Sequence, residues 1–277
     1  MPFLYISFRR DPIEASHLKL RVKTLSSSHG KLILVLISMS HLPFDLPGGM
    51  SREQCDTILS IVAIAENSTT KWWEAYNYAE DIHDRRGLTC SLVGFCSGTS
   101  DLLWVVKRLA EIDPKHPLVA FLPALRKVDG SDSTKGLKDF GDVLAANCND
   151  SWKRAVWDGI LHHYWQPAMD FAAKMGCRYP ITKGFLYDLA LNHGAGEMAK
   201  TAKRLAAKAP YKGGDEKEWL SHLIWQRAYI IKHEQQSTNS GQTDRCDLWK
   251  SILETGNVEL RRPIKGLKCY GERFTIE

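Results

Sequence analysis

The chain has 277 residues, of which 44% are hydrophobic, and its 37 Lys and Arg against 32 Asp and Glu give a formal charge of +5. This length is enough to bury a substantial core, in one large domain or in two lobes of one. The longest apolar run, residues 32–39, is far shorter than the roughly 20 residues of a membrane-spanning helix, so we expect no membrane partner. A mild positive charge without a Lys/Arg stripe is weak support for nucleic acid, and we expect none.

Residues 1–50 have mixed character and end in a turn-rich segment at 42–49, which is typical of a linker. We therefore expect an N-terminal extension over 1–50 and one folded domain over 51–277. The apolar run at 32–39 follows Lys31, as a signal-peptide core follows a basic residue, which favours export. The preceding segment is unusually long for a signal peptide. A buried strand, or a start site placed upstream of the true signal, are therefore alternatives.

The first predicted helix begins after Ser51. Ser51 and Gln54 match a capping box, and apolar residues then recur at helical spacing up to a C-terminal end at or near Glu66. From 71 to 96, aromatic and β-branched residues interrupted by Gly87 and Gly94 predict a short twisted sheet, and Asp84 falls within this region.

The rest of the chain is predicted to be mainly helical. Apolar spacing between Pro- or Gly-containing breaks predicts helices at 101–111, 152–174, 183–191, 197–208 and 216–235. The predicted fold class is therefore α+β, predominantly α-helical, with one small β-sheet.

The cysteines and two short motifs give little support for a metal or a cofactor. The seven cysteines include no C-x-x-C pair, and they are either buried thiols or members of one or two disulfides. Residues 194–199 fit a loose dinucleotide fingerprint, but no alternation of strands and helices surrounds them. Residues 233–237 begin like a zinc-protease helix but have Ser237 where the second histidine is required. We expect neither metal nor cofactor.

Glu66 and Asp84 are a candidate pair of carboxyl groups on different elements. Glycoside hydrolysis needs one carboxyl group that protonates the leaving oxygen and one ionised group that acts on water or carbon. Spacing alone is weak support, because 32 acidic residues offer many such pairs, and two surface carboxylates are the ordinary alternative.

Three motifs surround this pair: Ala65-Glu-Asn-Ser68, Asp84-Arg-Arg-Gly-Leu-Thr89 and Gly94-Phe-Cys-Ser-Gly-Thr-Ser-Asp101. Further segments follow in order at 121–131, 187–194, 213–216, 256–257 and 270–271. Over about residues 51–274, the chain resembles the family 46 glycoside hydrolases known as chitosanases.

This resemblance implies a lysozyme-like fold of two lobes with a cleft between them. It also implies a monomeric, endo-acting enzyme that hydrolyses the β-1,4 bonds of chitosan with inversion. By its motifs, Glu66 matches the family's general acid, Asp84 its general base, and Thr89 the threonine that helps to hold the attacking water. The family's buried charge relay behind the acid matches three further residues: Asp188, Arg227 and Arg245.

The resemblance also implies contacts with the substrate. The matching positions are Ser68, Tyr78, Arg86, Asp101, His193 and Glu234. Asp101 and Glu234 match acidic contacts, which suit a polymer of glucosamine ammonium groups. Each position has an ordinary alternative: Asp101 as a helix N-cap, Tyr78 and His193 as core groups, and Glu234 on a solvated helix face.

His83 and Arg85 flank Asp84 at positions where small glycines are more usual in the bacterial members. Either cation could alter the pKa of the base or the room beside it. Two other functions stay open: a related hydrolase of chitin or peptidoglycan, and a non-catalytic protein that binds glucosamine polymers.

Overall fold

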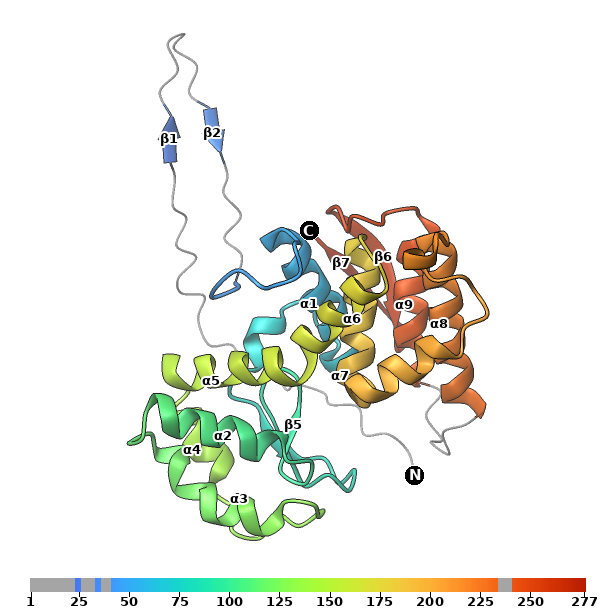
Figure 1. Ribbon diagram of the computed structural model, residues 1–277. Helices are drawn as coiled ribbons and strands as arrows, with labels where there is room; N and C mark the ends of the chain where they lie inside the picture. The colour runs from blue at the N-terminus through green and yellow to red at the C-terminus, as the bar shows by residue number, and fades with distance from the viewer. Residues whose placement is uncertain (1–22, 26–32, 36–40, 234–240) are drawn as a thin grey trace.

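The computed structural model describes residues 23–25, 33–35, 41–233 and 241–277, and those from 41 onward form two lobes (Figure 1). The smaller lobe contains β3 (Ala79–Asp81), β4 (Leu88–Cys90), β5 (Phe95–Cys96), α2 (Asp101–Ile112), α3 (Leu122–Val128) and α4 (Phe140–Ala146). The larger lobe contains α1 (Arg52–Asn67), α6 (Gln166–Lys174), α7 (Pro180–Lys203), α8 (Glu216–His233), α9 (Gly241–Glu254), β6 (Ile264–Cys269) and β7 (Glu272–Ile276). Helix α5 (Asp150–Ile160) packs on α2 and leads from the smaller lobe into the larger one.

Helix α1 confirms the predicted helix and its capping box. The Ser51 side chain accepts a hydrogen bond from the Gln54 amide, and the Gln54 side chain accepts one from the Ser51 amide at 2.9 Å. Every residue from Cys55 to Ala65 is buried, so α1 passes through the core of the larger lobe. The helix ends at Ser68 in the left-handed conformation, which places Glu66 in the last turn, where α1 leaves the core.

The predicted sheet is also confirmed. Strands β3, β4 and β5 form an antiparallel sheet in which Thr89 lies opposite Glu80 on one side and Cys96 on the other. Asp84 lies in the turn between β3 and β4, so it is attached to the smaller lobe while Glu66 belongs to the larger one. The pattern therefore places the two carboxyl groups on different lobes.

The predicted helices correspond to α2, to α8 and to a segment from 150 to 174 in which a π-helical turn (Leu161–Trp165) joins α5 to α6. Helix α7 covers the helices predicted at 183–191 and 197–208. The break between them corresponds to a kink at Gly194, where φ is 81°. The second helix was predicted to end at Lys208, but in the structure it ends at Lys203. Spacing did not indicate the short helices α3 and α4, the mostly polar α9, or the hairpin of β6 and β7.

The segment predicted to be a linker packs on the folded body. Leu42 is 3% exposed and Leu46 is 6% exposed. The Trp165 indole donates a 2.8 Å hydrogen bond to the Pro47 carbonyl, and the Lys183 ammonium donates one of 2.8 Å to the Gly48 carbonyl. The turn-rich segment at 42–49 is therefore a strap that is fixed to the folded body. Within the apolar run upstream, Ile33–Val35 forms strand β2, which pairs with β1 (Lys23–Leu25).

No helix in the described part of the chain is long and apolar enough to cross a membrane. All seven cysteines belong to described segments and are free thiols, six of them buried and Cys148 half-buried. Of the two interpretations that the sequence allowed, the structure shows buried thiols.

The packing around α7 predicts opposite effects on stability when a methyl group is added at two of its glycines. A Cβ at Gly184 would lie 2.7 Å from the Trp249 ring and 2.8 Å from Ile58, whereas nothing lies within 4 Å of a Cβ at Gly196. Gly184→Ala should lower the free energy of unfolding by about 1–3 kcal/mol through overpacking. Gly196→Ala should raise it by about 0.4–1 kcal/mol. Urea unfolding of both variants checks this, and equal effects would contradict it.

Candidate active site

A chain of charges connects Glu66 with the buried core of the larger lobe. The Arg245 guanidinium, on α9, forms an ion pair with Glu66 through Nη2 and lies 3.1 Å from Asp188 Oδ1 through Nε. The exposed fraction of the side chains falls along this chain from 29% at Glu66 to 9% at Arg245 and 2% at Asp188. Glu66 is therefore the accessible end of a network whose other end is closed to solvent.

Burial and neighbouring charges shift the pKa values of the network residues in opposite directions. Burial raises the pKa of Asp188, although Arg245 and the Trp249 indole, which donates a 2.9 Å hydrogen bond to Asp188, both lower it. Burial lowers the pKa of Arg245, but Asp188 and Glu66 outweigh it, so the pKa is raised overall. Arg245 therefore stays a cation between two acids.

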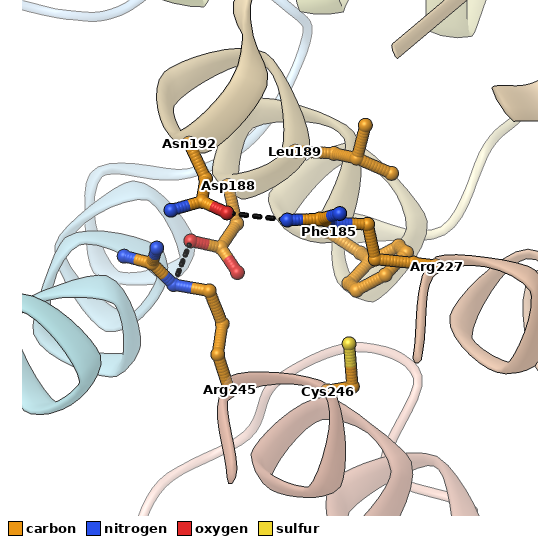
Figure 2. Close-up of a pocket in the computed structure, with 7 residues that line it drawn as sticks. All are labelled: Phe185, Asp188, Leu189, Asn192, Arg227, Arg245 and Cys246. Atoms are coloured by element: carbon orange, nitrogen blue, oxygen red, sulfur yellow. Dashed lines mark hydrogen bonds and ion pairs between the residues drawn. The ribbon is translucent and has the colours of Figure 1, made fainter. Parts of the chain in front are cut away.

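Arg227 contributes to this network without a direct ion pair to Asp188. Its guanidinium donates a 2.6 Å hydrogen bond to the Asn192 side chain, as Figure 2 shows. Burial lowers the pKa of Arg227 to about 10. Arg227 and Arg245 both line a cavity of about 10 Å³, the space of about one water molecule. The structure thus brings all three predicted relay residues together, with Asp188 and Arg245 in direct contact.

Two predicted substrate positions lie along this network: Ser68 follows the helix that ends in Glu66, and His193 lies within the fields of Arg227 and Arg245. Ser68 ends α1, and its backbone amide donates a 3.1 Å hydrogen bond to the Ile64 carbonyl. Burial, aided by Arg227 and Arg245, lowers the pKa of His193 to about 3, so this imidazole is neutral at ordinary pH. The Tyr270 hydroxyl donates a 3.0 Å hydrogen bond to the Ala65 carbonyl, a support for the helix end that spacing did not indicate.

Asp84 is held by Arg86 within its own turn. The Arg86 side chain donates to Asp84 Oδ2 from Nε at 2.7 Å and from Nη2 at 2.6 Å, and its backbone amide donates to Oδ1 at 3.0 Å. Asp84 and Glu66 both raise the pKa of Arg86, against burial, which lowers it. The charge of Glu66 therefore acts on the guanidinium that holds Asp84.

Thr89 and Tyr78 lie in and beside the sheet that carries the Asp84 turn. Thr89, on β4, is 5% exposed, and its hydroxyl lies 3.5 Å from the Cys96 sulfur. The Tyr78 hydroxyl donates a 3.1 Å hydrogen bond to Glu80, and burial together with Glu80 raises the Tyr78 pKa. Both residues are therefore oriented by neighbouring strands.

Asp101, a predicted acidic substrate contact, is mostly buried and held by hydrogen bonds in the structure. It is the first residue of α2 and 8% exposed. Its Oδ1 accepts hydrogen bonds from the Cys96 amide, the Thr99 hydroxyl and the Leu102 amide, and its Oδ2 accepts one from the Tyr164 hydroxyl. These four donors join α2 to the sheet and to the π-helical turn. An ammonium group would have to share this carboxylate with them.

Glu234 lies outside the described residues. Among the residues that the structure does describe, no group of three or more His, Cys, Asp or Glu side chains is placed to hold a metal ion.

Comparison with known proteins gives consistent matches. The family model for glycosyl hydrolase family 46 matches residues 60–264. A chitosanase of Streptomyces sp. (strain N174) is 34% identical over 227 residues, which are 79% of this chain and 80% of that protein. The structure of the GH46 chitosanase of Gynuella sunshinyii in complex with chitotetraose has a TM-score of 0.74 at 30% identity, covering 82% of this chain and 99% of that one.

A structure of native chitosanase from Bacillus subtilis MY002 has a TM-score of 0.74 at 27% identity, over 83% of this chain and all of that one. These likenesses confirm the predicted lysozyme-like α+β fold of two lobes. The family match contains Glu66, Asp84, Thr89, Asp188 and Arg245. The chain therefore belongs to glycosyl hydrolase family 46.

Proposed function

We propose that this chain is an endo-acting chitosanase that hydrolyses the β-1,4 bonds of chitosan with inversion, with Glu66 as general acid and Asp84 as general base. The observation that carries the proposal is the pair of acids on elements of different lobes, each held by its own arginine. The relatives whose names state a chitosan activity support the choice of polymer.

In this mechanism, Glu66 protonates the glycosidic oxygen while Asp84 takes a proton from a water that attacks C1 on the opposite face of the sugar. After proton transfer, Glu66 is a carboxylate, and the charge-assisted hydrogen bond from Arg245 stabilises that form. Arg86 holds Asp84 in one orientation, and Thr89 helps to hold the water. Inversion requires the two carboxyl groups to lie roughly 6.5–9.5 Å apart with substrate bound.

Substrate contacts are proposed at Ser68, Tyr78, Arg86, Asp101, His193 and Glu234, with Asp101 also held by the sheet and by Tyr164. The chain would act as a monomer. We also propose that it is exported, because a polysaccharide of this kind is encountered outside the cell and an apolar run precedes the folded body.

The test is to incubate the wild type with highly deacetylated chitosan, chitin and peptidoglycan, and to follow both reducing ends and their anomeric form by NMR. We expect rapid release from chitosan alone, with the α-anomer appearing first from the β-linked polymer. The β-anomer first would contradict inversion. Faster release from chitin or peptidoglycan would indicate the related hydrolase, and binding without any release would indicate a non-catalytic binding protein.

A further inference from the structure

The turn that carries Asp84 holds two non-glycine residues in a conformation that favours glycine. His83 has φ of 57° and Arg85 has φ of 70°. In this left-handed region a side chain crowds the following carbonyl oxygen, and glycine avoids that cost. Strain of this kind is commonly kept at functional sites, where the side chain has a role that offsets it. The side chains of this turn therefore need a functional explanation.

The two arginines of this turn, Arg85 and Arg86, differ in their partners. Asp84 is paired with Arg86, and Asp81 accepts from the His83 amide at 2.9 Å and lies 3.2 Å from its imidazole. Arg85 is exposed, and within the described residues its guanidinium has no ion pair or hydrogen bond. Of the two arginines in the turn that positions the proposed base, Arg85 is therefore the one without an acidic partner among the described residues.

We propose that Arg85 is a specificity-determining residue that weakens the preference of this chain for fully deacetylated chitosan and improves the acceptance of stretches that contain N-acetylated units. This inference rests on the proposed function, because it requires the polymer to pass Asp84. A glucosamine unit carries an ammonium group, which an unpaired guanidinium repels. An N-acetylglucosamine unit is uncharged, and its amide carbonyl can accept a hydrogen bond from the guanidinium.

The test compares Arg85→Gln, which removes the charge, with Arg85→Lys, which keeps it. The quantity measured is the ratio of kcat/KM on a highly deacetylated chitosan to kcat/KM on a substantially acetylated one. At low salt, Arg85→Gln should raise this ratio about fivefold over the wild type, the factor that corresponds to one repulsive contact at the surface. Arg85→Lys should leave it near the wild-type value. High salt should remove most of the difference, because both charges are exposed.

A third variant separates charge from backbone strain. Arg85→Gly removes both, so it should shift the ratio as Arg85→Gln does, with a melting temperature no lower than that of the wild type. An unchanged ratio in Arg85→Gln, or an equal shift in Arg85→Lys, would overturn the inference.

Binding distinguishes a failure of this inference from a failure of the proposed function. The Kd of fully deacetylated and of acetylated oligosaccharides is measured for Glu66→Gln with and without Arg85→Gln. A fivefold tightening for the deacetylated oligosaccharide alone would support selection by Arg85, even if the wild type released no sugar from any polymer. No change in either Kd would overturn it, even if hydrolysis were rapid.

Discussion

Glu66→Gln should lower the release of reducing ends from chitosan by about 10²–10⁴-fold, because glutamine keeps the size of the side chain but cannot give a proton to the leaving oxygen. The amide can still accept a hydrogen bond from Arg245, so the network behind it is disturbed little in shape. Initial rates at saturating chitosan measure the loss. Circular dichroism and thermal unfolding establish that the fold is intact.

The matched control is Glu74→Gln, a change of the same chemistry in the short helix that follows α1 (Trp72–Ala75). Glu74 is exposed, and its one ion pair within the described residues joins it to Lys71 at 3.2 Å. This variant should retain wild-type activity, since surface pairs of this kind contribute little. A loss below tenfold in Glu66→Gln would mean that another carboxyl group is the general acid.

The position of Glu66 could be predicted because local signals agree there. A capping box fixes the start of α1, apolar spacing carries it forward, and the same spacing ends at the residue in question. The sheet around Asp84 could be predicted for a similar reason, since aromatic and β-branched residues are interrupted by two glycines over a short distance. Both predictions depend only on residues that lie close together in the sequence.

Contacts between distant segments could not be predicted from such signals. Spacing did not place Arg245 against Glu66, because helical spacing within α9 says nothing about which distant segment the helix packs against; only the resemblance named that residue. Spacing also gave no sign that four donors hold Asp101, because two of these donors, Tyr164 and Cys96, belong to separate elements. The strap at 42–48 was misjudged because its Pro and Gly residues resemble a linker, while two buried leucines hold it in place.

Arg245→Met should lower the free energy of unfolding by about 3–5 kcal/mol, because it leaves the Asp188 charge buried and without its cation. Activity should fall as well, since Glu66 loses the donor that orients it. The double variant with Asp188→Asn should regain part of the stability, because asparagine is uncharged and can still accept the Trp249 hydrogen bond. Urea unfolding and initial rates, both measured well below the melting temperature, separate the two effects.

The matched control for this experiment is Arg262→Met. Arg262 also binds α1, through a 2.7 Å ion pair with Asp56 and a 2.8 Å hydrogen bond to Thr57, but at the end of the helix far from Glu66. It should lose stability and keep wild-type activity per folded molecule. If Arg245→Met behaved in the same way, the ion pair with Glu66 would be structural only. Loss of activity in Arg245→Met alone would mean that the buried pair acts on the acid, and that its place behind Glu66 serves catalysis as well as stability.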